Sequence, residues 1–299
     1  MTVLDPSMIG RPVRAAAYAI IGMGMIGAAD NVMPEVARHI GIAQFHFTRS
    51  AMALALVPLA FAVAGVRFRI VNIWGVIGRS SLLTLGMVIY FACVGFLPVA
   101  QVLAGVFTAP LWIMLATRLE GGRIEPVGGA LIFLGFLGCL AVVQPQPGAM
   151  GWLALGPLLA GFFYGMGGKV TRRWTAEEDP WVLVATYLAM IGALGGLALL
   201  VFDPAHDDYL TRGWAPMPAH VVFYCALQAA VALVAVALLT KAYQIAAPAF
   251  VGAFEYTVLI VAAGVGYLAW GHGLNGLSAI GIAMILASGA ALAWWGDRA

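Results

Sequence analysis

The sequence contains few charged residues: only 9% of its 299 residues are Asp, Glu, Lys or Arg. Soluble domains carry about 25% charged residues, so this chain could not cover a water-exposed surface of its length. Hydrophobic residues make up 63%, and the mean hydropathy is +0.97. The net charge is only +2, and the basic residues are scattered over short loops without forming an extended basic patch, so the charge does not indicate a nucleic-acid partner. The composition predicts a membrane protein with lipid as a partner.

Cysteines and catalytic motifs are also scarce. The three cysteines, Cys93, Cys139 and Cys225, stand in apolar segments, which predicts packing and not a disulfide framework or metal site. GxSxG, HExxH and Walker motifs are absent from the sequence. The segment Gly22–Gly27 fits GxGxxG, but no strand precedes it, so a dinucleotide fold is excluded. We therefore expect neither an enzyme nor a cofactor.

Ten apolar stretches, separated by short polar or Pro/Gly segments, are each of a length suited to crossing a bilayer. They span residues 14–33, 44–65, 75–97, 99–119, 127–143, 152–169, 181–202, 220–240, 246–270 and 276–295. The first follows two arginines, as in a signal peptide, but its length and the many later spans favour a retained helix. The sequence thus predicts an all-α polytopic membrane protein with ten transmembrane helices.

The loop charges predict an orientation. If the N-terminus is cytoplasmic, twelve of the 15 basic residues, including Arg79, fall on the cytoplasmic side. The opposite side collects only Arg38, Arg49 and Arg212. Positive charge favours the cytoplasmic side, so both termini are predicted to be cytoplasmic.

A weak internal repeat divides the chain at residues 148 and 149. Three pairs of segments match, the first two at an offset of 138 and the third at 152: Gly27–Asn31 with Gly165–Lys169, Ala51–Leu56 with Ala189–Leu194, and Gly129–Leu134 with Gly281–Leu286. Each unit, 1–148 and 149–299, would hold five helices, and an odd number inverts the second unit. Inverted repeats recur in secondary transporters, whose substrate sites lie near the membrane midplane.

The chain resembles the drug/metabolite transporter superfamily, specifically its ten-helix EamA-type branch. The resemblance covers nearly the whole chain and rests on Asn31–Pro34, on Arg49, on residues 242–256 and on the openings of the fifth and tenth helices. Within the superfamily it is most similar to bacterial aromatic amino-acid exporters. That resemblance implies export of Phe, Tyr, Trp and related metabolites across the bacterial inner membrane. The chain departs from the family pattern at Tyr256, where a proline is frequent, and at Ala109, where the acid before the proline is missing.

Ionisable residues deep in a membrane are costly, which makes them functional candidates. Glu255 lies about nine residues into the ninth predicted helix and could bind a substrate ammonium, carry a proton, or bond a neighbouring helix. Asp30 is a second candidate proton carrier; with Asn31 it could instead cap the outer end of the first helix. Lys169 could bind substrate or anchor the sixth helix at the cytoplasmic face. Arg49, near the outer mouth, could snorkel to the interface.

Polar and aromatic residues at helical spacing predict a cavity or a helix contact. The fourth helix carries Gln101, Gly105, Thr108 and Trp112 on one face. The full set of expected substrate-binding residues is Asn31, Tyr90, Gln101, Thr108, Trp112, Tyr164, Tyr224, Gln228, Glu255 and Tyr256. Aromatic groups with polar tips could stack on an aromatic substrate, and packing between helices is the alternative for each.

These observations predict a secondary transporter that works by alternating access as a monomer or weak dimer. The third, fourth, eighth and ninth helices should line a central cavity, with help from the first and sixth. An integral membrane enzyme acting on a lipid-linked substrate is the alternative, and it would need a catalytic cluster at one interface. A structural or receptor-like protein would have no central hydrated cavity.

Overall fold

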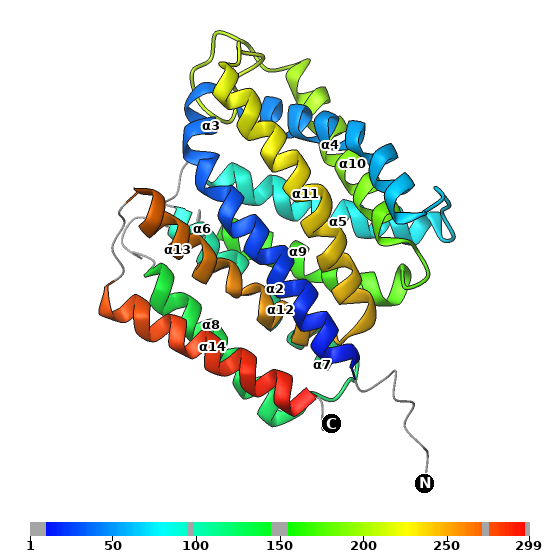
Figure 1. Ribbon diagram of the computed structural model, residues 1–299, viewed down its shortest axis with the longest axis vertical. Helices are drawn as coiled ribbons and strands as arrows, with labels where there is room; N and C mark the ends of the chain where they lie inside the picture. Colours follow the sequence, from blue (N-terminus) through cyan, green and yellow to red (C-terminus); the bar gives the residue numbers. More distant parts are fainter. Residues whose placement is uncertain (1–9, 95–98, 145–154, 271–274, 297–299) are drawn as a thin grey trace.

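The computed structural model describes residues 10–94, 99–144, 155–270 and 275–296, and within them every regular element is a helix (Figure 1). The helices are α2 (Arg11–Ala29), η1 (Asp30–Val32), α3 (Met33–His39), α4 (Ile42–Ala64), α5 (Ile73–Val94), α6 (Val99–Val106), α7 (Ala109–Leu119), α8 (Pro126–Val143), α9 (Leu155–Trp174), α10 (Pro180–Leu199), α11 (Ala219–Ile245), α12 (Pro248–Glu255), α13 (Thr257–Trp270) and α14 (Gly276–Gly296). Among the described residues, six segments are long and apolar enough to cross a bilayer: α2–α3, α4, α5, α10, α11 and α12–α13. The prediction of a polytopic α-helical membrane protein is confirmed.

Three of the predicted continuous helices are divided. The first consists of α2, the 3-10 turn η1 and α3, and it continues six residues beyond the predicted end at residue 33. The fourth breaks between α6 and α7, where the turn closes through a bond from Thr108 N to Gly105 O of 3.1 Å. Pro110, the second residue of α7, lacks the N–H that would bond to the carbonyl of Val106, and this explains the break.

The third break, between α12 and α13, occurs at Tyr256 without a proline. Here the hydroxyl of Thr257 donates to the carbonyl of Phe254 at 2.8 Å, a back-bond that competes with the helical pattern. The Tyr256 hydroxyl donates to Phe107 O at 3.3 Å, across to the break between α6 and α7. The two helix breaks are thus joined to each other inside the protein.

Four pairs of helices from opposite halves of the chain pack side by side: α8 with α14, α5 with α9, α4 with α10, and α2 with α11. The α8–α14 pair is visible at one side of the bundle, and α2 runs alongside α11 (Figure 1). Gly138 and Gly281 allow α8 and α14 to approach closely, since a Cβ on either would lie 2.6–2.8 Å from the other's carbonyl oxygen. Small residues at such contacts are typical of membrane helices, which associate through close packing.

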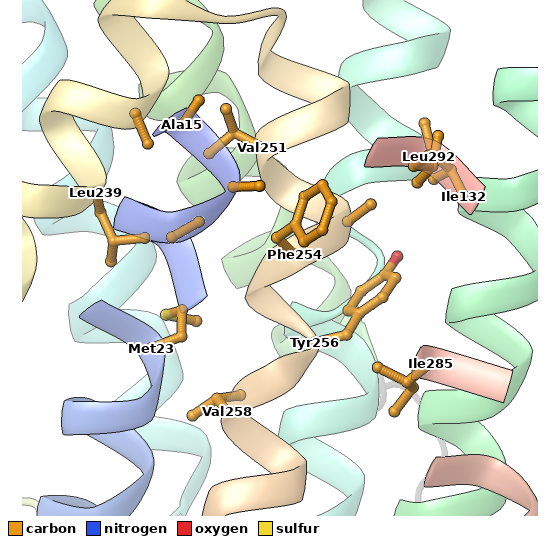
Figure 2. Packing of buried hydrophobic residues seen from close by; sticks show 14 of the residues in the cluster. Ala15, Met23, Ile132, Leu239, Val251, Phe254, Tyr256, Val258, Ile285 and Leu292 are labelled. Atoms are coloured by element: carbon orange, nitrogen blue, oxygen red, sulfur yellow. The ribbon is translucent and has the colours of Figure 1, made fainter. Parts of the chain in front are cut away.

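The largest apolar cluster joins α2 and α11 to the α8–α14 pair through α12 and α13. Figure 2 shows Phe254 and Tyr256 between Met23 of α2 on one side and Ile285 of α14 on the other. Tyr256 is only 1% exposed, and its ring packs edge-on against Phe107 with centroids 5.8 Å apart. The break at Tyr256 is therefore held by packing as well as by its hydrogen bond.

Candidate functional site

A cavity of about 160 Å³ lies inside the bundle. Residues of α2, η1, α5, α6, α7, α9, α11, α12 and α13 line it, together with Tyr256 between the last two. The prediction that the third, fourth, eighth and ninth helices line a cavity, helped by the first and sixth, is confirmed. One residue each from α4 and α10, Arg49 and Tyr187, completes the wall, and the sequence did not indicate either contribution.

Glu255 lies in this wall at the last position of α12 and is 4% exposed. The hydroxyl of Tyr164, on α9, donates to its Oε1 at 3.1 Å. Tyr243 of α11 is a second phenol next to the same carboxylate. Tyr164 and Tyr243 both line the cavity, so the carboxylate combines a bond to a neighbouring helix with access to the cavity.

A second carboxylate, Asp30, lines the cavity at the junction of α2 and η1. Its Oδ1 accepts a hydrogen bond of 3.1 Å from Nε2 of Gln228, which also donates to Ala29 O at 3.0 Å. Tyr90 and Arg49 interact electrostatically with this carboxylate from α5 and α4. Asp30 stands at the C-cap position of α2, which was one interpretation of it, but the chain continues as helix to His39, and Asp30 also lines the cavity.

Arg49 is buried, with 7% of its surface exposed, and lines the cavity. Its guanidinium carbon lies 5.0 Å from the centre of the Phe45 ring and 5.8 Å from that of Phe91. One nitrogen, Nη2, is 3.4 Å from Nδ1 of His46, and Tyr187 interacts with the guanidinium, whereas Nε has no hydrogen-bond partner among the described residues. The expectation that Arg49 snorkels to the interface is wrong, since its side chain points inward against aromatic rings.

Arg79 is the seventh residue of α5 and is only 2% exposed. Its Nε donates to Thr171 Oγ1 at 2.9 Å, its Nη1 to Leu183 O at 3.3 Å, and its Nη2 to Thr240 Oγ1 at 2.6 Å. Counting Arg79 among the cytoplasmic loop charges was therefore wrong. It ties α5 to α9, α10 and α11 and lines the cavity.

The remaining candidates whose side chains the structure describes are not among the residues that line the cavity. Gly105 and Thr108 face α9: a Cβ on Gly105 would overlap Pro157, and one on Gly161 would lie 2.9 Å from the Thr108 hydroxyl. Trp112 packs edge-on against Phe162, with ring centroids 5.6 Å apart. Gly105, Thr108 and Trp112 of the fourth predicted helix therefore pack against α9, which agrees with the alternative interpretation of this face as a helix contact. The side chain of Gln101 lies outside the described residues.

Asn31 and Tyr224 also have other partners. Nδ2 of Asn31 donates to the carbonyl of Gly27 at 2.8 Å, one turn earlier. The ring of Tyr224 lies 5.9 Å from that of His220 on the same helix. Lys169, which the repeat aligns with Asn31, pairs with Glu120 at 2.7 Å. Hydrogen bonding and charge from Lys169 lower the pKa of Glu120, which supports the anchoring interpretation of Lys169.

Of the ten predicted substrate residues, the structure brings five to the cavity: Tyr90, Tyr164, Gln228, Glu255 and Tyr256. The cavity wall also contains Asp30, Arg49 and Arg79, which were not among those ten residues. A membrane-spanning helical bundle whose internal cavity carries both carboxylates and guanidinium groups has the features of a membrane transporter, because buried charges are retained where they serve a solute or ion pathway.

Comparisons with known proteins support this class. The chain is 30% identical over 217 residues to the "Riboflavin transporter" of Rhizobium johnstonii, covering 72% of this chain and 68% of the relative. It therefore belongs to the same family of membrane transporters. It is also 24% identical over 276 residues to the "Pseudopaline exporter CntI" of two Pseudomonas aeruginosa strains, covering 92% of this chain and 94% of the exporter.

A solved structure described as "Crystal structure of protein" has the same fold, with a TM-score of 0.76 at 16% identity over 95% of this chain and 99% of that one. No family model matches the chain.

Proposed function

We propose that this protein is a secondary transporter of the EamA-type drug/metabolite superfamily that exports small amphipathic metabolites by alternating access. The central observation is the cavity, which residues from both halves of the chain enclose and which exposes Asp30, Glu255 and Arg49 to a solute. The transporter names of the relatives support a transporter over an enzyme acting on a lipid-linked substrate.

The helix pairing supports ten spans in two inverted repeats, 1–148 and 149–299. Under that scheme α4 corresponds to α10 and α8 to α14, and both pairs pack against each other. The same scheme makes α5 correspond to α11 and α2 to α9. The two remaining close pairs, α5 with α9 and α2 with α11, are therefore equivalent contacts. Arg49 and Tyr187, which interact in the cavity wall, are separated by 138 residues, the offset of the sequence repeat. The divided helices α6–α7 and α12–α13 are the corresponding fourth members of each unit.

The proposed orientation places both termini in the cytoplasm of a bacterial cell, with the protein in the inner membrane as a monomer or weak dimer. Because Arg49 and Arg79 are interior residues, they no longer count as loop charges. Eleven basic residues then remain on the proposed cytoplasmic side and two, Arg38 and Arg212, on the other. The charge bias is stronger than the sequence alone indicated.

The proposed substrates are aromatic amino acids and related metabolites. In this scheme the substrate carboxylate binds Arg49, whose free Nε could donate a charge-assisted hydrogen bond. The substrate ammonium binds Glu255 or Asp30, and the substrate ring packs among Tyr90, Phe107 and other aromatic residues of the wall. The relative named as a riboflavin transporter supports an aromatic solute, and riboflavin belongs in the same test.

Substrate exchange into proteoliposomes tests this function. Vesicles preloaded with unlabelled phenylalanine, tryptophan or riboflavin should accumulate the corresponding radiolabelled compound, and vesicles without the protein should not. Arg49→Gln should abolish accumulation, while the matched substitution of exposed Arg172 should leave it unchanged. Accumulation of none of these compounds would overturn the substrate assignment. Failure with a wider panel of metabolites as well would overturn the transporter proposal.

Glu255 and Asp30 are the proposed proton carriers. If either carries a proton, uptake should rise with an imposed pH gradient, and Glu255→Gln or Asp30→Asn should remove that dependence while exchange continues. The matched control is Glu177→Gln, an exposed carboxylate between α9 and α10. Uptake that is insensitive to the gradient in the wild-type protein would exclude proton coupling and leave facilitated transport.

A further inference from the structure

A cluster of metal-ligating side chains lies outside the cavity, where α3 meets the start of α11. Glu35 and His39, one turn apart on α3, face His220, the second residue of α11. One ligand atom from each of the three lies within 4.8 Å of the other two. The side chains are 34%, 32% and 47% exposed, respectively, so an ion could reach them from solution.

The hydrogen bonds within the cluster leave Oε1 of Glu35 and Nε2 of His39 available to bind a metal. Arg38 binds Oε2 of Glu35 at 2.9 Å, so Oε1 is the oxygen that faces the histidines. Nδ1 of His39 lies 3.0 Å from the backbone oxygen of Glu35, and a proton donated there leaves Nε2 with its lone pair. Metal-binding histidines are typically held by this kind of second bond.

The distances suit a small tetrahedral ion. Zinc bonds of about 2.0–2.2 Å to nitrogen and oxygen place neighbouring ligand atoms about 3.4 Å apart. Nε2 of His220 lies 3.5 Å from Oε1 of Glu35. The two imidazole rings meet edge to face with centroids 5.1 Å apart, so a side-chain rotation can bring the third ligand into place. Two histidines and one carboxylate form a zinc ligand set that leaves a fourth position for water.

We propose that Glu35, His39 and His220 bind Zn²⁺ or a similar first-row divalent transition metal, and that the bound ion locks α3 to α11. Further in, Gln228 of α11 bonds Ala29 and Asp30, which belong to α2 and η1, the helical segments that directly precede α3. Eight residues of helix, about 12 Å, separate His220 from Gln228. A metal bridge at the helix ends would hinder any separation of these helices that opens the cavity. This consequence for transport, unlike the binding, rests on the proposed function.

Calorimetric titration of tag-free, chelator-treated protein with zinc chloride tests the site. The wild-type chain should bind about one ion, and His39→Ala, His220→Ala and Glu35→Gln should each weaken binding at least tenfold. His206→Ala, in the connection between α10 and α11, is the matched control and should bind as tightly as wild type. Thermal unfolding without zinc should be unchanged in all four variants, because the side chains are partly exposed. Wild-type protein without saturable binding, or His220→Ala with wild-type affinity, would overturn the metal site.

Zinc added to the outside of right-side-out proteoliposomes should then inhibit exchange, a chelator should restore it, and His220→Ala should resist inhibition. Binding with zinc-insensitive exchange would overturn the locking role while the site stands. Binding by a protein that exchanges no metabolite would overturn the proposed function and not the metal site.

Discussion

Two arginines line the same cavity in different bonding states. Arg79 donates from all three of its nitrogens to Thr171, Leu183 and Thr240. Arg49 lies 3.4 Å from a histidine nitrogen, interacts with Tyr187, packs against two rings and keeps a buried Nε without a partner among the described residues. A buried charge is costly, so its hydrogen bonds indicate what the fold uses it for. Arg79 serves the fold, whereas Arg49 has donor capacity left for a ligand.

Unsatisfied polar groups lie beside both arginines. In α4, His46, Thr48 and Ser50 around Arg49 each have a buried polar atom without a hydrogen-bond partner in the described structure. Unsatisfied buried groups are rare, and a ligand is one way of satisfying them. In α5, Ser80 beside Arg79 and Thr84 one turn later also have buried hydroxyls without a partner among the described residues. The Thr171 hydroxyl, which accepts from Arg79, donates to Gly167 O at 2.8 Å, so the Arg79 network continues into α9.

The largest expected effect is the loss of stability in Arg79→Ala. The substitution removes three hydrogen bonds to a charged group and leaves a void where four helices meet. We expect the free energy of unfolding to fall by about 3 kcal/mol. Unfolding in mixed micelles with increasing denaturing detergent measures it, with Arg172→Ala as an exposed control. Equal stability of the two variants would show that Arg79 does not hold the helices together.

Arg49→Gln should have the opposite effect: a small change in stability and a large loss of substrate affinity. Because the bond from Arg49 to His46 is long and Gln can still bond to Tyr187, we expect the free energy of unfolding to change by less than about 1 kcal/mol. Affinity for a transported carboxylate should fall about 10- to 100-fold, the value of a hydrogen bond to a charged group. Equilibrium binding of labelled substrate to the purified protein measures it. A variant that loses stability and keeps its affinity would make Arg49 a second structural arginine.

The sequence was sufficient to predict the helical membrane class and five of the cavity residues. Glu255 and Gln228 were found because polar groups are conspicuous in apolar helices. Arg49 and Arg79 were misplaced because each lies within six residues of the start of a predicted span, where a charge count assigns it to the loop. Their polar neighbours, Ser50 next to Arg49 and Ser80 next to Arg79, were the available signal, since a run of polar residues inside an apolar span predicts an internal network.

Other features depend on contacts that sequence periodicity cannot supply. The spacing of Thr108 and Trp112 predicts a common face but does not identify its neighbour, which proved to be α9. The break at Tyr256 has no proline to mark it and depends on a bond to Phe107 from another helix. The substrate roles of all ten predicted residues, including those that line the cavity, stay predictions.

Phe91→Leu tests how the aromatic rings contribute to the difference between the arginines. The ring of Phe91 lies under the Arg49 guanidinium, and a cation–π contact is worth about 0.5–1 kcal/mol. We expect substrate affinity to fall about two- to fivefold, less than for Arg49→Gln. The matched control is Phe133→Leu, on the exposed face of α8. Unchanged affinity in Phe91→Leu would indicate that Phe45 alone positions the guanidinium.

The smallest effect is expected for a basic residue at the edge of the bundle, Lys169, whose partner Glu120 is well exposed. Lys169 lowers the pKa of Glu120 in the folded protein, so the pair stabilises the fold above the ordinary carboxyl pKa. That stabilisation is lost as the pH falls through the lowered pKa. Thermal unfolding of Glu120→Gln and wild type should therefore differ slightly near pH 7 and converge in acid, while the control Glu177→Gln should not differ from wild type at either pH. A difference that persists in acid would show that Glu120 acts through packing and not through its charge.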